Sequence, residues 1–321
     1  MEISCGIPPG PRAVEHALVA EELGYERVWL YDSPALYPDV WVWLARIAEA
    51  TTTIGLGPAV LVPSLRHVLV QANAIATVSA LAPGRLVVAI GTGFTGRMTL
   101  GQRPLPWAWV ADYIRQLRGL LAGETVEVDD ALVRLMPPEG YLPMPVDVPI
   151  LIAANGPKGL AVARELGDGV MTIGPTFTEF DTCSVLTFGT VLDPGESADS
   201  GRAIAAAGPM AAVAYHGIYE GNPADVEGLP GGVEWRARID AIPEAERHLA
   251  LHEDHFVAVT ERDRSVITGD VLRMFTWTDE APALRARLDA LAASGATEVL
   301  FAAGGPDVER ELRAFHAMAV A

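Results

Sequence analysis

Short apolar runs alternate with amphipathic segments along most of the chain. The apolar runs are bounded by turn residues and predict buried strands at 3–7, 27–31, 53–60, 86–90, 150–154, 170–173, 187–192 and 298–302. Between them, apolar residues recur at helical spacing with Gly or Pro near the ends. This pattern predicts helices at 11–23, 38–51, 68–82, 107–121, 157–166 and 281–293, and from Pro306 onward.

This alternation predicts parallel strands joined by helices, and its eight strands favour a closed (β/α)8 TIM barrel over an open doubly wound sheet. No Gly-x-Gly-x-x-Gly sequence follows the first strand, which counts against a Rossmann dinucleotide site. We expect one barrel domain over residues 1–321. The Pro-rich segment 124–148 carries hairpin signals, and segment 199–278 predicts a helical cap without a good strand, inserted before the last barrel strand.

The ends of the predicted strands are the expected place for chemistry, because TIM barrels carry their sites at the carboxyl ends of the strands. These ends are rich in Gly, Pro and small residues, with one carboxylate and few bases. They comprise Pro8, Asp32, Ser33, Ala59, Val60, 91–97, 153–158, 174–176 and Gly304. Small residues at several strand ends leave room for a large flat ligand.

The segment 149–169 combines a buried strand, the turn Asn155-Gly156-Pro157-Lys158-Gly159 and the start of a helix. Backbone N–H groups at a helix N-terminus favour an anion, and Lys158 adds a full positive charge at the same place. The segment therefore predicts an anion site. The alternative is a plain tight turn, since many strand–glycine–helix turns bind nothing.

The chain has 41 acidic and 23 basic residues and a net charge of −18. A field of this sign repels nucleic acid and anionic membranes, so neither is an expected partner. Any anionic ligand must be held by local groups. Two cysteines, Cys5 and Cys183, make no disulfide framework, and the N-terminus lacks the pattern of a secretion signal. We expect a cytoplasmic protein.

Three histidines, His248, His252 and His255, fall on one face of a predicted helix. Two such side chains with an outside ligand make a metal site in some proteins. Histidines on an acidic helix are more often a solvated or inter-subunit surface, or hydrogen-bonded core groups. We therefore predict no metal site, and we leave open a role of these histidines near the substrate.

Four motifs carry a resemblance to a known family. They are residues 28–32 (VWLYD); 57–60 (GPAV) with Pro63, Arg66 and His67; Gly84 and Arg85 followed by 90–93 (IGTG); and 154–158 (ANGPK) followed by Asp168 and Gly169. In this combination the chain resembles the luciferase-like flavin and deazaflavin oxidoreductases. Within this family, its motifs most resemble those of the methylene-tetrahydromethanopterin reductase-like subgroup, which uses coenzyme F420. The motifs cover residues 1 to about 175.

The resemblance implies a barrel that holds F420, or alternatively FMN, at its strand ends, with a small-molecule substrate and a homodimeric assembly. It implies that Asp32 contacts the ring head group, that the Ala59–Val60 peptide is cis, and that the turn after 150–154 cradles the phosphate. Arg97 is a second candidate cation, and Arg66 either contacts the site or only supports its loop. The implied cofactor-binding residues are Asp32, Ala59, Val60, Gly91, Gly93, Arg97, Ala153, Ala154, Asn155, Gly156, Pro157, Lys158, Gly174, Pro175 and Thr176.

Two departures from the family pattern affect the predicted chemistry. The His that follows the strand-two Asp in several deazaflavin dehydrogenases is Ser33 here, and a Glu often found after Gly93 is Phe94. Because Ser is a poor general acid or base, a proton must come from Tyr37, His67 or the cap. We take Asp32, Ser33 and Tyr37 as the catalytic candidates.

Such a site favours C=C or C=N reduction over alcohol oxidation. The alternatives are an FMN-dependent luciferase-like monooxygenase and a barrel that binds cofactor without turnover. A metal-dependent hydrolase is a more distant alternative, because the strand ends lack its His and Asp ligands.

Overall fold

The computed structural model describes residues 1–321, and its main feature is a barrel of parallel strands. Neighbouring strands follow the order β3-β2-β1-β11-β9-β8-β7-β4. Parallel bridges Leu56–Leu86 and Leu61–Ile90 bring the two outer strands together and nearly close the barrel. The predicted TIM barrel is confirmed. Its strands are β1 (Glu2–Ile7), β2 (Arg27–Leu30), β3 (Gly55–Pro58), β4 (Val88–Ile90), β7 (Ile150–Ala153), β8 (Gly169–Thr172), β9 (Cys183–Leu192) and β11 (Glu298–Ala302).

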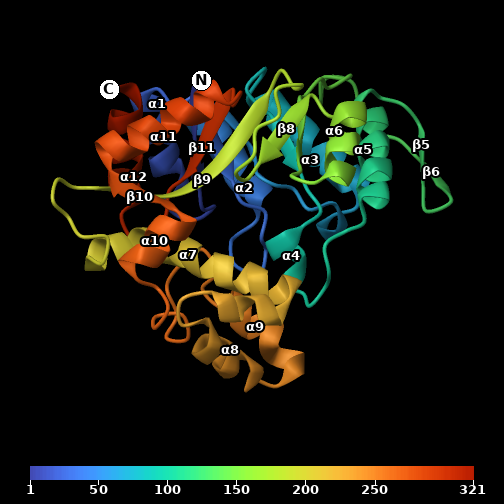
Figure 1. The fold of residues 1–321 in the computed structure, drawn as a ribbon. Helices are drawn as coiled ribbons and strands as arrows, with labels where there is room; N and C mark the ends of the chain where they lie inside the picture. Colours follow the sequence, from blue (N-terminus) through green and yellow to red (C-terminus); the bar gives the residue numbers. More distant parts are fainter.

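Seven helices surround these strands (Figure 1). Their apolar faces form one hydrophobic core with the outward side chains of the barrel. Local signals set several of their ends: Gly24, at φ 86°, ends the first helix, and the Asp39 side chain accepts from the N–H groups of Trp41 and Val42 to start the second. They are α1 (Ala13–Leu23), α2 (Val40–Ala50), α3 (Val68–Leu81), α5 (Trp107–Leu121), α6 (Pro157–Leu166), α11 (Ala281–Ala293) and α12 (Val308–Val320).

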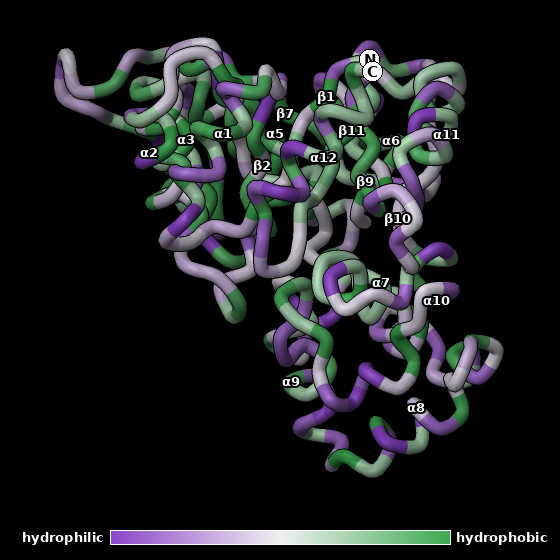
Figure 2. Tube along the Cα trace, turned by 90° about the vertical axis from the view of Figure 1, so that its left-hand side faces the viewer, coloured by the Kyte–Doolittle hydropathy of each residue, from purple (hydrophilic) through white to green (hydrophobic).

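Residues 199–278, which lie between β9 and α11, form a second layer of helices that we call the cap. It contains α7 (Gly201–Gly221), α8 (Gly232–Asp240), α9 (Arg247–His252), α10 (Gly269–Phe275) and the 3-10 turns Pro223–Gly228 and Glu244–Glu246. The cap packs around a hydrophobic core of its own, which includes Tyr215, Trp235 and Leu272. It lies beyond one end of the barrel, and both termini lie at the other end (Figures 1 and 2).

The structure adds two elements to the predicted pattern and lengthens a third. Strand β10 (Trp277–Glu280) begins inside the segment predicted to lack a strand, and it pairs in parallel with β9. Its backbone approaches Gly189 so closely that a Cβ there would overlap Trp277, which explains why this short polar strand needs a glycine opposite. The short helix α4 (Phe94–Met98) follows β4, and β9 starts at Cys183 rather than at 187.

The Pro-rich excursion outside the barrel contains the predicted hairpin, formed by β5 (Val126–Val128) and β6 (Ala131–Val133). Inside the barrel, Trp29, Ala89, Leu151, Met171 and Leu300 make a separate buried cluster. The barrel interior is therefore packed, so a ligand of the barrel must bind beyond the strand ends. No helix has both the length and the apolar composition needed to cross a membrane.

The close approach of two strands at Gly57 gives a test of barrel packing. A Cβ at Gly57 would overlap the carbonyl oxygen of Val87, whereas one at Gly10 would meet nothing within 4 Å. We expect Gly57→Ala to lower the free energy of unfolding by about 3 kcal/mol, as overpacking does in other cores. The control Gly10→Ala should change it by less than about 0.5 kcal/mol. Equal urea midpoints for the two variants would show that β3 and the Val87 segment are not this close.

Candidate functional site

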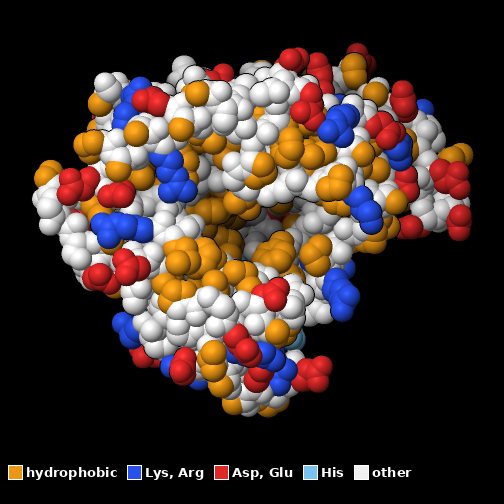
Figure 3. Space-filling view, viewed as in Figure 1, with side chains coloured by type: hydrophobic (Ala, Val, Ile, Leu, Met, Phe, Trp, Pro, Cys, Tyr) orange, Lys and Arg blue, Asp and Glu red, His pale blue; other side chains and the backbone are white.

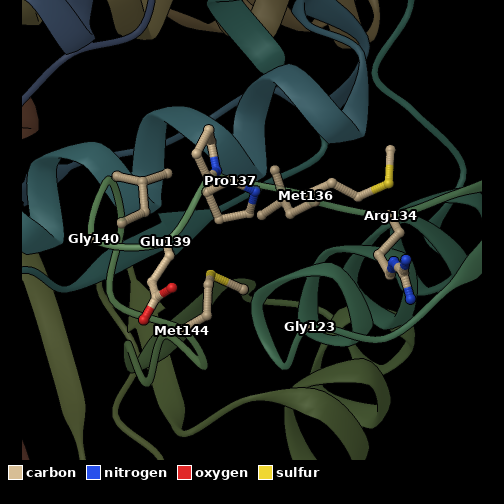
Figure 4. A pocket seen from close by; sticks show the side chains of 10 residues that line it. Gly123, Arg134, Met136, Pro137, Glu139, Gly140 and Met144 are labelled. Carbon is tan, nitrogen blue, oxygen red and sulfur yellow. The ribbon is translucent and has the colours of Figure 1, made fainter.

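The carboxyl ends of the barrel strands face the cap, and the space between the two layers is the candidate site. Figure 3 shows a hollow between the barrel above and the cap below, with hydrophobic side chains on its walls. A second cleft lies elsewhere, on the excursion between Gly123 and Met144 (Figure 4). None of its lining residues belongs to a barrel strand, so we do not consider it the site of chemistry.

Small side chains from three strand ends meet on the floor of this hollow. A Cβ built on Gly91 would lie 3.0 Å from Cγ2 of Val60 and 3.4 Å from Cβ of Ala153. Ala59, Val60 and Ala153 are all partly exposed at this level. The Ala59–Val60 peptide bond is cis, as the resemblance implied. The floor therefore has no large side chain over these three strand ends and is open to a flat ligand.

Asp32 lies at the end of β2, and its side chain is 2% exposed. Arg66 Nη1 lies 2.9 Å from Oδ1 and 2.8 Å from Oδ2 of this carboxylate, and Arg66 Nη2 donates to Asp39 at 2.8 Å. The sequence left two roles open for Arg66. The structure places its guanidinium on the Asp32 carboxylate rather than in open space.

The environment of Asp32 combines burial with this counter-charge. Burial raises the pKa of the Asp32 carboxyl, while the Arg66 guanidinium and its hydrogen bonds act in the opposite direction. The carboxylate is thus held by Arg66 and is not a free acid or base at the rim. Its contact with a cofactor ring stays a prediction.

The turn before α6 offers unpaired donors. The backbone N–H groups of Asn155, Gly156, Lys158 and Gly159 donate to no backbone acceptor, and no side chain caps this helix. A Cβ on Gly156 would meet nothing within 4 Å, and Lys158 is exposed. Lys158 is also the only lysine of the chain. The turn has the donors of an anion site, as the sequence predicted.

Asn155 connects this turn to the loop after β8. Its side-chain amide donates to the carbonyl of Ile173 at 2.9 Å, and its carbonyl accepts from the N–H of Ile173 at 3.1 Å. The loop continues through Gly174, at φ 96°, and the exposed Pro175. The two predicted cradle segments therefore lie side by side. The hydroxyl of Thr176 donates to the carbonyl of Ser294 instead of pointing freely into the cradle.

The remaining predicted residues have other partners. Arg97 donates to the carbonyl of Arg103 and the hydroxyl of Ser64, both at 2.6 Å, so it fixes two loops and is not a free cation. Gly93, at φ 83°, precedes α4 at the rim. The Ser33 carbonyl accepts from the N–H of Tyr37, and burial raises the pKa of the Tyr37 phenol, which makes it a weaker acid.

Sequence reasoning did not identify Tyr31, Phe188 and Phe256, which form an aromatic group with Tyr37 over the barrel mouth. Tyr31 lies 5.8 Å from Tyr37 and 6.4 Å from Phe256 between ring centroids, and Phe188 lies 6.4 Å from Phe256. Three of these rings come from the barrel side, and Phe256 comes from the cap. Their positions, far apart in sequence, carry no local signal. Together they make the wall beside the floor apolar.

The predicted histidine face is wrong in its geometry. Helix α9 ends at His252, and Asp254 and Phe256 both have positive φ, so His255 leaves the helix. The structure instead joins His255 to His216 of α7, with 3.1 Å between their Nδ1 atoms. His216 Nε2 lies 3.2 Å from Asp263 Oδ1, and His255 Nε2 lies 3.3 Å from the hydroxyl of Thr95.

These polar groups are buried and partnered. His216, His255 and Asp263 are at most 3% exposed. Burial lowers the pKa of His255 to about 2, with further contributions from the charges of His216 and His252. Burial would raise the pKa of Asp263, but hydrogen bonds from His216, Thr260 and Trp235 outweigh it and lower that pKa. The group therefore consists of a neutral His255 and an ionised Asp263, and no three ligands are arranged as a metal site.

The chain matches one protein family. The family described as luciferase-like monooxygenase matches residues 3–182. An F420-dependent glucose-6-phosphate dehydrogenase of Beutenbergia cavernae is 32% identical over 173 residues, which is 48% of this chain and 50% of that protein. The chain thus spans about half the length of this relative.

Two further relatives align over nearly the whole chain. A 5,10-methylenetetrahydromethanopterin reductase of Archaeoglobus fulgidus is 26% identical over 314 residues, 92% of this chain and 90% of that protein. The structure of the coenzyme F420 dependent tetrahydromethanopterin reductase from Methanopyrus kandleri superposes with a TM-score of 0.68. It is 20% identical and covers 100% of this chain and 99% of its own. At that identity, the structural likeness shows a shared fold.

The pairing of Asp32 with Arg66 gives a stability prediction. Arg66→Met leaves the buried Asp32 carboxylate without its counter-charge, and we expect a loss of about 3–5 kcal/mol in the free energy of unfolding. The double variant Asp32→Asn with Arg66→Met should recover much of that loss, because no buried charge remains without a partner and the Asp39 carboxylate is exposed to water. Urea denaturation at pH 7 measures both. A double variant less stable than Arg66→Met alone would contradict the pairing.

The neutral His255 predicts a pH dependence. His216 of α7, His252 of α9 and Asp263 face its ring. Below a pH of about 6.5 the unfolded chain binds a proton at His255 that the folded chain does not bind. The free energy of unfolding therefore decreases as the pH is lowered. Between pH 7 and 5.5 the wild type should lose about 1 kcal/mol more than His255→Gln. The control His248→Gln should follow the wild type, and parallel curves for wild type and His255→Gln would contradict the prediction.

Proposed function

The chain belongs to the luciferase-like monooxygenase family, and we propose that it is an oxidoreductase that uses the deazaflavin coenzyme F420. The names of two relatives support this choice. The dehydrogenase of Beutenbergia cavernae and the reductase of Methanopyrus kandleri are both F420-dependent by name. The observation that carries the proposal is the set of unpaired donors around Lys158 at the barrel mouth.

The residues of the mouth fit such a cofactor. The N–H groups of residues 155, 156, 158 and 159, together with Lys158, suit a phosphodiester in a protein whose net charge is −18. The small floor at Val60, Gly91 and Ala153 suits a flat ring. When bound, coenzyme F420 would supply two-electron hydride transfer. The chain's own part is to hold the ring on this floor and to exclude water with the aromatic wall.

The substrate is a small organic molecule, and we propose C=C or C=N reduction as the reaction. Ser33 and Phe94 occupy the two positions at which the family pattern described above often has His and Glu, which are acid–base side chains. Tyr37 is a weak acid for the reason given above. A proton that accompanies the hydride therefore needs another source than the end of β2.

Two other functions are compatible with family membership. An FMN-dependent monooxygenase is favoured by the description of the family itself. A barrel that binds cofactor without turnover is favoured by the absence of a free acid or base beside Asp32. Fluorescence titration with oxidised F420 and with FMN separates the first two, and micromolar binding of FMN alone would reject F420. Tight F420 binding without reduction by any donor would favour the third.

Because Lys158 is the single lysine, its environment can be observed directly. Reductive methylation with 13C-formaldehyde adds one NMR signal beyond that of the N-terminus, and F420 should shift this signal. We expect Lys158→Gln to weaken F420 binding about tenfold, as loss of one charge-assisted hydrogen bond does, with little change in hydride transfer at saturation. Arg134→Gln, an exposed cation on the distant cleft, is the matched control. An unshifted signal with F420 bound would place the phosphate elsewhere.

A further inference from the structure

A buried polar chain runs from the cap to the rim of the barrel. Its members are Thr95 of α4, His255, His216 of α7 and Asp263, joined by successive contacts of 3.3, 3.1 and 3.2 Å. Three of the four are at most 3% exposed. A structural tie between cap and barrel does not require two imidazoles in sequence, each of which loses its hydration on burial.

Asp263 determines the direction of hydrogen bonding. Its Oδ1 accepts from Trp235 Nε1 at 2.8 Å, and its Oδ2 accepts from the hydroxyl of Thr260 at 2.7 Å. An ionised carboxylate only accepts, so His216 must carry its proton on Nε2 and present an unprotonated Nδ1 to His255. A neutral imidazole has one protonated nitrogen, which assigns the His216 tautomer.

The direction then passes to the barrel. Because His216 Nδ1 accepts, His255 must donate from its own Nδ1, which leaves His255 Nε2 as an acceptor. The hydroxyl of Thr95 is therefore the donor in the contact with His255 Nε2. Its proton is directed into the cap, and the lone pairs of its oxygen are left to accept from outside.

Two separate contacts place this hydroxyl at the mouth. A Cβ on Gly96, the residue after Thr95, would lie 3.2 Å from the backbone oxygen of Asp32. Phe256, the residue after His255, lies 6.4 Å from Tyr31 between ring centroids. Thr95 and His255 are thus flanked by the end of β2 and by the aromatic wall. Thr95 itself is partly exposed.

We propose that the Thr95 hydroxyl oxygen accepts a hydrogen bond, and then the proton, from an O–H or N–H group of the reduced substrate. His255, His216 and Asp263 are its positioning residues. This inference rests on the proposed F420 cofactor and changes the proposed reaction, because it keeps C=N but replaces C=C with C=O. The reduced substrate carries O–H or N–H on the carbon that exchanges hydride, so the oxidised substrate contains C=O or C=N rather than C=C. The apolar wall suits an uncharged compound.

In the oxidising direction, the C–H bond of the reacting carbon breaks and its electron pair leaves as hydride to the oxidised F420 of the proposed function. The substrate O–H or N–H proton passes to Thr95 Oγ1 as the Thr95 proton passes to His255 Nε2. The Nδ1 proton of His255 then moves to His216 Nδ1, and the Nε2 proton of His216 moves to Asp263. The substrate gains a double bond, the cofactor gains two electrons, and Asp263 becomes neutral. In reduction the same proton returns by the same path.

The first test reads the chain without cofactor or substrate. Long-range 1H–15N NMR of protein labelled with 15N-histidine distinguishes the tautomers of the seven histidines. We expect His216 to be protonated on Nε2 and His255 on Nδ1. A His255 protonated on Nε2 would make Thr95 an acceptor from the cap, and this result would overturn the proposal.

The second test compares uncharged secondary alcohols with the matching ketones, from 2-propanol and acetone to cyclohexanol and cyclohexanone. With F420 present, the best alcohol should bind about tenfold more tightly than its ketone, because only the alcohol donates to Thr95. Thr95→Val should abolish this preference, and Thr95→Ser should restore it. His255→Leu should also abolish it, since the freed hydroxyl can then donate to the ketone.

The third readout is chemical. The alcohol that binds best should reduce F420 in the wild type, and Thr95→Val should slow this reduction about a hundredfold, in the range of general acid–base effects, at unchanged F420 affinity. Alcohol and ketone binding of equal strength, or bound alcohol without reduction of F420, would overturn the assignment of Thr95. Failure of F420 to bind rejects the proposed function instead, and the histidine tautomers can still be measured.

Discussion

The buried pair of Asp32 and Arg66 connects the parts of the mouth that would otherwise be independent loops. Arg66 joins the end of β2 to the start of α2, because its second nitrogen donates to Asp39, the residue that caps α2. The hydroxyl of Tyr113 on α5 donates to the Arg66 carbonyl at 3.4 Å. Helix α4 packs on the Asp32 backbone through Gly96. Breaking a buried pair leaves an uncompensated charge, so these elements depend on one interaction.

Electrostatics at the mouth are local rather than global. The chain carries a net charge of −18, and most of its cations are arginines that pair with carboxylates, as Arg118 does with Asp168. Arg66 and Arg97, the two arginines considered for the site, are both engaged with protein groups. Lys158 and the free N–H groups beside it are therefore the groups left to hold an anion. A screened surface field of the wrong sign matters little at this short range.

The sequence predicted the barrel well because each strand and helix carries its own periodicity and end signals. The segments 107–121, 157–166 and 281–293 match α5, α6 and α11 in both bounds. The prediction failed where the determinant is not local. Strand β10 has a polar sequence and depends on Gly189 of another strand, and α9 ends early because the backbone at Asp254 turns to positive φ.

The same difference between local and non-local determinants explains which site residues the sequence revealed. The cis peptide at Ala59–Val60 and the donors around Lys158 belong to contiguous motifs, whereas His216 and His255 are 39 residues apart and no spacing rule connects them.

The candidate cofactor-binding residues and most of the buried polar chain lie in different parts of the molecule, the barrel and the cap. The segment that matches the family, residues 3–182, contains the floor, the Asp32 pair and the turn before α6 with its unpaired N–H groups. His216, His255, Phe256 and Asp263 lie beyond it, in the cap, and they meet the matched half at Thr95, which contacts His255, and at Tyr31, which lies beside Phe256. A shared cofactor requires a constant binding surface, but a particular substrate requires its own walls and its own proton path. Under the proposed function, the half of the chain shared with the family holds the cofactor, and the cap selects the substrate that meets it.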